Sequence, residues 1–250
     1  ENGDINATRL EAGLYGTIER GTWNAKVYNY NSERGIPGAI VNNVWRRGER
    51  VWDTNSFFQG SFVKEVNDQF KTQVNAKYAF YRTHYVNNDD KLIEVDNLYK
   101  QREVYVSTAN MYTIFPFWDV SMSYDFQWNE MKADMYGFVF PTRFTNLLSI
   151  ATALRLGKVK LQGSGLATFV NDRVKEGPAP KARQILTPAV FLSYKPFDKH
   201  DFSLRAFYKK TFRMPTFNDL YYADMGNSKL DPEYVTQYNL GTVYQKTVGE

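Results

Sequence analysis

The chain has 250 residues, 43% of them hydrophobic and 16% aromatic, with no cysteine. Its net charge of +4 comes from 31 basic and 27 acidic residues spread along the sequence, and the lack of a basic block argues against a nucleic-acid-binding surface. No cysteine nucleophile is available, and no apolar run approaches the roughly 18 residues of a membrane-spanning helix.

Eleven β-strands are predicted in succession. Most of them are 12 to 16 residues long, more than twice the globular mean of roughly 5–6. Such length suits a tilted strand that crosses a bilayer. In chain order the predicted strands cover residues 8–19, 22–33, 50–65, 69–83, 98–112, 118–130, 145–156, 159–170, 183–195, 201–211 and 234–246.

The connections between these strands alternate between short and long. The long ones run from about a dozen residues to more than twenty. Short turns on one rim and long loops on the other are typical of outer-membrane barrels, with the turns periplasmic and the loops extracellular. The short connections are residues 20–21, 66–68, 113–117, 157–158 and 196–200.

Hydrophobicity alternates with a period of two in several strands. This pattern gives each strand one apolar and one wet face, which also fits a soluble antiparallel sheet. Charged and amide side chains along whole strands, and aromatic residues at the ends of the apolar face, favour a membrane barrel with a wet lumen. Strands 50–65 and 98–112 alternate poorly. In strand 118–130 the apolar set is Val120, Met122, Tyr124, Phe126 and Trp128, against Ser121, Ser123, Asp125, Gln127 and Asn129.

The odd number of strands predicts that the sheet belongs to something larger. Bacterial single-chain barrels have an even number of strands, and two long unpaired edges are not tolerated in lipid. The predicted fold is therefore all-β: an antiparallel up-and-down meander of about 11 long strands, forming part of a larger transmembrane barrel.

The longest connection carries the most specific motif. Residues 212–222 read FRMPTFNDLYY and residues 226–233 read GNSKLDPE. Together they resemble the late-barrel signature of TonB-dependent outer-membrane receptors. Residues 30–38, YNSERGIPG, resemble a loop common in such receptors from Bacteroidetes-type bacteria.

The resemblance implies a barrel of about 22 strands that encloses an N-terminal plug, the plugged-lumen class. Residues 1–250 would then be a partial barrel domain, with the plug and the final strands absent. Implied partners are outer-membrane lipid, the receptor's own plug domain, the TonB energy-transducing complex, and a small-molecule or metal-chelate ligand. No cofactor and no enzymatic activity are implied.

By the same resemblance, the function is energised uptake of a scarce nutrient too large for porins: a ferric siderophore, cobalamin or haem. Haem receptors often carry a histidine between the two parts of the signature. Residues 216–225 contain none, which lowers haem relative to the other two.

The residue types of the signature loop also have a physical explanation that does not depend on the family resemblance. Pro215 ends the preceding strand, while asparagine, aspartate and glycine favour turns. Flat amphipathic aromatic side chains beside a cation suit ligand capture. The alternative is that they pack the loop onto the barrel rim. The candidate ligand-binding residues are Arg213, Asn218, Tyr221, Tyr222 and Asn227.

Other polar clusters are weaker candidates. His84 and His200 lie far apart, and no His–Asp pair is visible, so neither is expected to act in catalysis or metal binding. Residues 87–90 offer oxygen ligands of the kind that Ca²⁺ prefers, but their spacing fits no known loop. A solvated loop tip is the simpler interpretation.

The sequence pattern also fits two other classes of protein. One is a soluble, aromatic-rich glycan-binding β-protein, and the other is a non-energised porin or a barrel assembly protein. A single curved sheet with lipid-facing aromatics would separate a membrane barrel from a soluble protein with two packed layers.

Overall fold

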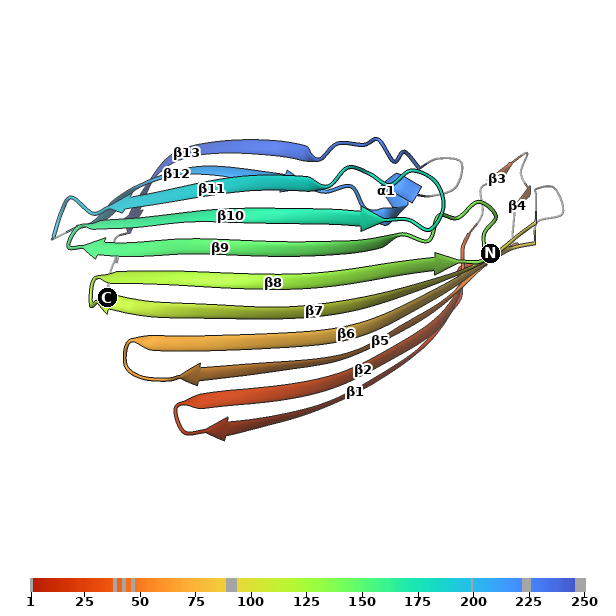
Figure 1. Cartoon of the computed structure of the whole chain (residues 1–250), viewed down its shortest axis with the longest axis horizontal. Helices are drawn as coiled ribbons and strands as arrows, with labels where there is room; N and C mark the ends of the chain where they lie inside the picture. The colour runs from red at the N-terminus through yellow and green to blue at the C-terminus, as the bar shows by residue number, and fades with distance from the viewer. Residues whose placement is uncertain are drawn as a thin grey trace.

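The computed structural model describes residues 2–37, 40–41, 44–45, 48–88, 94–198, 200–221 and 226–245. These residues form one antiparallel sheet of 11 strands (Figure 1), in the order β1-β2-β5-β6-β7-β8-β9-β10-β11-β12-β13. The strands are β1 (Ile5–Ile18), β2 (Gly21–Gly35), β5 (Glu49–Glu65), β6 (Phe70–Asn87), β7 (Val95–Phe115), β8 (Trp118–Ala133), β9 (Thr142–Leu156), β10 (Val159–Arg173), β11 (Arg183–Tyr194), β12 (Asp201–Arg213) and β13 (Glu233–Gln245).

The predicted meander is confirmed, because each strand of the sheet pairs only with its neighbours along the chain. Two small elements were not predicted. A hairpin of β3 (Ile40–Val41) and β4 (Val44–Trp45) lies in the connection between β2 and β5, and a five-residue helix, α1 (Phe217–Tyr221), lies between β12 and β13. Several strands are also longer than predicted, above all β7 with 21 residues.

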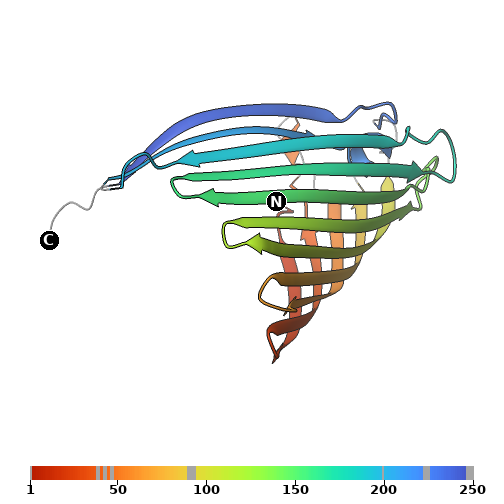
Figure 2. The same ribbon diagram turned by 60° about the vertical axis from the view of Figure 1, so that its left-hand side comes forward.

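The sheet is open and strongly curved (Figure 2), with β1 and β13 as its two edges. All five short turns lie at one end of the strands and the long loops at the other (Figure 1). We call these ends the short-turn rim and the long-loop rim. α1 lies at the long-loop rim, on the concave side of the sheet (Figure 2).

The strand register separates two chemically different faces. Residues paired directly across antiparallel strands point to the same side. One cross-strand row is Phe58, Tyr78, Val104, Trp128 and Phe144, and the adjacent row on the other side is Gln59, Lys77, Tyr105, Gln127 and Thr145. The first belongs to the apolar face and the second to the polar face.

The polar face carries a network of side-chain hydrogen bonds between neighbouring strands. Lys77 donates to Glu103 at 3.0 Å, and Tyr105 donates to Asp125 at 2.8 Å. These groups are only partly buried, so they lie beside water rather than in a dry core. The arrangement suits the wall of a hydrated lumen.

Nothing in the described part of the chain covers the apolar face. Tyr78, Met122 and Ile150 are 47%, 52% and 56% exposed, although all three belong to apolar rows. The buried hydrophobic residues of the described chain are few: Val51, Ala79, Ala133, Phe138, Val170, Ile185, Leu220 and Tyr221. A second packed layer, as in a soluble sandwich, is therefore absent from the described residues. Among those residues, no helix has both the length and the apolar character needed to cross a membrane.

The two faces predict opposite responses to one added charge. Val74 lies on the apolar face of β6, midway between the aromatic residues Phe70 and Tyr78, and is 40% exposed. If the apolar face meets lipid, Val74→Arg in the full-length protein should destabilise the inserted barrel by about 2–4 kcal/mol, because it places a cation near the bilayer midplane. The measurement is the denaturant midpoint of folding into lipid vesicles.

Gln73→Arg is the matched control, since the adjacent Gln73 points to the polar face. Its midpoint should stay near that of the unaltered protein. Equal losses from both substitutions would contradict the assignment of the faces.

Candidate ligand-binding site at the long-loop rim

The connection between β12 and β13 is held in shape by a reciprocal cap at the start of α1. The Thr216 amide donates to Asp219 Oδ2 at 2.8 Å, and the Asp219 amide donates to Thr216 Oγ1 at 3.2 Å. This is the capping-box arrangement, in which two otherwise unpaired backbone donors are satisfied. The bond from the Thr216 amide is the largest cause of the lowered pKa of Asp219.

A buried ion pair attaches this connection to the sheet. Arg143, near the start of β9, donates through Nε and Nη2 to both carboxylate oxygens of Asp172 on β10, each at 2.7 Å. Its Nη1 donates to the Pro215 carbonyl at 2.8 Å. The two side chains are only 12% and 3% exposed. Because Arg143 binds Asp172 and the loop backbone together, it fixes the loop on the polar face.

Two aromatic residues of α1 complete the attachment. The Arg143 guanidinium lies over the Phe217 ring at 5.1 Å, and Phe217 packs against Tyr221 at 6.0 Å between ring centroids. The Tyr221 hydroxyl lies 3.4 Å from Asp172 Oδ2, and burial is the main cause of the raised pKa of Tyr221. Tyr221 is only 8% exposed. In this structure Tyr221 packs the loop against the polar face of the sheet.

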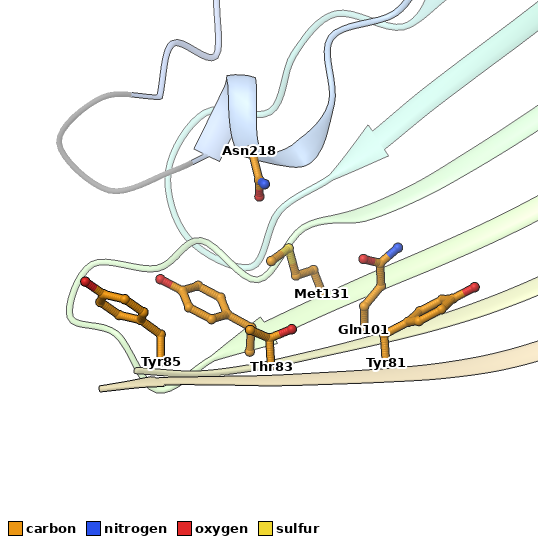
Figure 3. A pocket seen from close by; sticks show the side chains of 7 residues that line it. Tyr81, Thr83, Tyr85, Gln101, Met131 and Asn218 are labelled. Carbon is orange, nitrogen blue, oxygen red and sulfur yellow. The ribbon is translucent and has the colours of Figure 1, made fainter. Parts of the chain in front are cut away.

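A cavity of about 350 Å³ lies between α1 and those ends of β6, β7 and β8 that reach the long-loop rim (Figure 3). We call it the tyrosine cavity. Its lining combines aromatic faces with hydroxyl and amide groups, and none of the lining side chains carries a formal charge. The lining residues are Tyr81, Thr83, Tyr85, Tyr99, Gln101, Met131 and Asn218.

A second cavity of about 450 Å³ continues along the polar face beneath Phe217. It shares Gln101 with the tyrosine cavity, and Glu103 and Arg143 also line it. The two cavities therefore adjoin at Gln101. The lining of the tyrosine cavity is uncharged, whereas that of the second cavity includes charged groups.

The predicted site residues have different surroundings. Asn218 lines the tyrosine cavity, with its side chain directed toward it (Figure 3). Arg213 is 64% exposed and lies 3.4 Å from Asp219 and 3.8 Å from Glu233. Asn227 shapes the turn, because its amide donates to the Asp219 carbonyl at 3.0 Å and its side chain accepts from Lys229. Tyr222 lies outside the described residues.

One negative expectation from the sequence was wrong. His84 Nε2 lies 2.6 Å from Asp96 Oδ1, so a His–Asp pair does exist, and the His84 ring stacks on Trp52 at 5.2 Å. The pair joins β6 to β7. In the weak calcium candidate at residues 87–90, Asp89 and Asp90 lie outside the described residues. Within the described part of the chain there is no group of three or more His, Cys, Asp or Glu residues able to hold a metal ion.

The sequence pattern did not identify the strand residues that form the site together with the loop. Arg143 and Asp172 are 29 positions apart, and only the β9–β10 register brings them together. Tyr81 and Tyr99 could have been assigned to the polar face by counting alternate residues along β6 and β7. Their meeting beneath α1 depends on the curvature of the sheet, which the pattern does not contain.

A family model described as TonB-dependent receptor-like β-barrel matches residues 2–249. The chain belongs to this family. The proteins of this family are outer-membrane receptors and transporters rather than enzymes, so the predicted location in the bacterial outer membrane is confirmed. Among curated proteins, none matches the chain.

Solved structures of outer-membrane transporters share the fold. The copper transporter OprC superposes with a TM-score of 0.79 at 14% identity, over 98% of this chain and 44% of that one. The ferric citrate transporter FecA gives 0.72 at 14% identity, over 98% and 41%. The FrpB iron transporter from Neisseria meningitidis gives 0.75 at 10% identity, over 96% and 43%. The chain thus spans less than half the length of these proteins.

The ion pair of Arg143 and Asp172 should control the position of the whole connection. Removing one partner of a buried pair typically costs about 3–5 kcal/mol. In the full-length receptor, Arg143→Ala should therefore release residues 214–221 from the wall. Hydrogen–deuterium exchange should show faster exchange of the Leu220 amide, which donates to the Thr216 carbonyl.

Arg183→Ala is the matched control, since it breaks the ion pair to Asp231 at the same rim, whose partners are 29% and 77% exposed. Such an exposed pair is worth at most about 1 kcal/mol, so exchange in α1 should stay unchanged. Equal exchange rates of the Leu220 amide in the two variants would show that Arg143 holds the loop no more strongly than Arg183 does.

Proposed function

We propose that the intact protein is an energised outer-membrane receptor that imports a nutrient too large for porins. The observation that carries this proposal is the tyrosine cavity, which lies on the polar face beneath the folded loop of the long-loop rim. A ligand arriving from outside the cell meets this rim first if the long loops are extracellular, as in other outer-membrane barrels.

The cavity has the chemistry of a small-molecule site. Such sites combine apolar and aromatic walls with a few polar groups that fix orientation. Tyr81 and Tyr99 offer flat surfaces with few rotors, and Gln101 and Asn218 offer amide donors and acceptors. The cap of α1 and the Arg143–Asp172 pair hold Asn218 in place before binding, which lowers the ordering cost of capture.

We propose two roles in ligand capture for the candidate residues, which are Arg213, Asn218, Tyr221, Tyr222 and Asn227. Asn218 and the exposed Arg213 would contact the ligand. Tyr221 and Asn227 would act through the shape of the loop. The proposal assigns Tyr222 to the same loop by its sequence position alone.

The proposed partners follow from the polar face. Residues 1–250 would form part of a barrel domain whose lumen encloses the receptor's own plug. The hydrogen-bonded polar groups of β6, β7 and β8 suit contact with a hydrated plug. The TonB complex would supply energy through that plug, and outer-membrane lipid would cover the apolar face.

The proposed cargo is a metal chelate, with a ferric siderophore first and cobalamin or haem as further candidates. Three structurally similar proteins are a copper transporter, a ferric citrate transporter and an iron transporter, which favours a metal-containing cargo. A non-energised porin-type barrel is the second candidate, since its fold would show the same two faces.

Uptake by cells separates the two candidates. Cells that produce the full-length receptor are given ⁵⁵Fe-loaded siderophores, ferric citrate, labelled cobalamin or haem, with and without a protonophore. The proposal expects uptake of one of these that needs both the receptor and the membrane potential. Receptor-dependent entry of small sugars that survives the protonophore, without energised uptake of any chelate, would establish the porin instead.

A substitution in the cavity tests the site itself. In the full-length receptor, Tyr81→Ala should weaken binding of the imported ligand by roughly thirtyfold, since losing an aromatic hot-spot side chain typically costs about 2 kcal/mol. The measurement is the Kd of the purified receptor. Tyr78→Ala is the control, because Tyr78 lies three residues away on the same strand but on the apolar face.

Heat-modifiable gel mobility confirms that both variants fold. An unchanged Kd for Tyr81→Ala would show that the tyrosine cavity is not the binding site, even where energised uptake is real.

A further inference from the structure

Three cations lie side by side on the outward, apolar face of the sheet. Arg82 on β6 pairs directly with Lys100 on β7, which pairs directly with Lys132 on β8. Side chains at directly paired positions have Cβ atoms about 4.5–5.5 Å apart and point to the same side. We call these three residues the cation row.

The cation row lies just beyond an aromatic belt. Each of its members is four positions closer to the long-loop rim than a member of the row of Tyr78, Val104 and Trp128. Four residues of a tilted strand rise by roughly 10 Å along the membrane normal. Aromatic belts mark the edge of the hydrocarbon region, so the cation row lies at the depth of the lipid headgroups.

The charges of the cation row are not balanced within the described chain. Arg82 and Lys100 make no hydrogen bond or ion pair with any residue that the structure describes, and Lys132 has a single ion pair, to Glu130 at 3.2 Å. Like charges placed directly opposite each other on a sheet are destabilising. A bound anion would relieve this repulsion across the row.

Two further cations flank the row on the same face. Arg102 and Arg173 lie in the adjacent row with Glu130 and Thr142. Arg173 lies over the Phe144 ring at 5.3 Å. Glu130 is the one carboxylate in these two described rows. Closer to the loops, Asp96 contacts His84, and Asp134 accepts a hydrogen bond from the Leu98 amide.

We propose that Arg82, Lys100 and Lys132 form a binding site for the phosphate groups of a lipid in the outer leaflet. Arginine and lysine bind phosphate through short charge-assisted hydrogen bonds, and several adjacent cations suit a headgroup with more than one phosphate. A lipid is favoured over a dissolved anion because the apolar rows that begin four positions nearer the short-turn rim, with Tyr78, Val104 and Trp128, would hold its acyl chains.

The site is separate from nutrient capture, which takes place on the opposite face of the same strands. Tyr81 lines the tyrosine cavity, while its neighbour Arg82 points outward. The lipid would bind β6, β7 and β8 together where their long loops begin (Figure 1). Loss of the lipid site should leave ligand affinity unchanged, so the two proposals fail independently.

The test measures lipid binding by the full-length receptor, purified in a neutral detergent and freed of lipid. The probe is bisphosphorylated lipid A, and the readout is its apparent Kd by native mass spectrometry. The combined substitutions Arg82→Gln, Lys100→Gln and Lys132→Gln should weaken binding about a hundredfold, because each cation near a charged lipid surface contributes roughly a factor of five.

Two control variants separate specific binding from general charge. The charge-retaining set Arg82→Lys, Lys100→Arg and Lys132→Arg should bind within a few-fold of the unaltered receptor. A second set, Lys160→Gln, Arg205→Gln and Lys209→Gln, removes three positive charges from the polar face and should leave lipid binding unchanged. Should the triple glutamine variant fail to fold, Lys100→Gln alone should still weaken binding about fivefold.

Four results would overturn the proposal. The first is an unchanged Kd after loss of the cation row, and the second is an equal loss from the polar-face control. The third is equal affinity for lipid A stripped of its phosphates. Displacement of the lipid by inorganic phosphate at an equal concentration would also refute it, because the site would then bind the free anion without help from the acyl chains.

Discussion

One constraint underlies the rest of this structure: an unbroken antiparallel register across 11 strands. A slip of one residue in any strand would move its apolar set to the other face. Because the register holds, aromatic and aliphatic side chains of every strand combine into one continuous outward face. The polar side chains combine into a hydrogen-bonded wall on the other side, exemplified by Lys77 with Glu103. The described chain supplies no second layer over the outward face, which fits the proposed cover of outer-membrane lipid.

The same register creates the functional geometry at the long-loop rim. Alternation places Tyr81 and Arg82, adjacent in sequence, on opposite faces, one lining the tyrosine cavity and the other joining the cation row. The β9–β10 register brings Arg143 to Asp172, and this ion pair holds α1 over the cavity. Strands thus supply both the wall and the anchor of the loop, which needs only a short helix of its own. The proposed nutrient site and the proposed lipid site lie on opposite faces of one sheet.

The sequence predicted the meander well because turn residues and period-two alternation are local signals. Strand 98–112 was predicted too short and read as poorly alternating, and β7 shows why. Lys100 and Arg102 stand on the apolar face beyond the aromatic belt, where headgroups replace hydrocarbon, so polar residues there break the pattern without breaking the strand. The surroundings of the candidate site residues are not local signals of this kind. Tyr221 is a candidate for ligand contact by its sequence, and its burial depends on Asp172, a residue 49 positions away along the chain.

Site-directed labelling along β8 tests the two-faced register most directly. Residues 1–250 contain no cysteine. Single cysteines at positions 121 to 126, placed in a full-length receptor whose other segments have been freed of cysteine, can therefore be compared in whole cells and in lipid vesicles. Spin labels at Ser121, Ser123 and Asp125 should respond to a water-soluble relaxation agent. Labels at Met122, Tyr124 and Phe126 should respond instead to dissolved oxygen, which concentrates in lipid. Equal accessibility of all six labels to both agents would contradict the two-faced register. So would a reversed pattern, with oxygen reaching positions 121, 123 and 125 and the water-soluble agent reaching positions 122, 124 and 126.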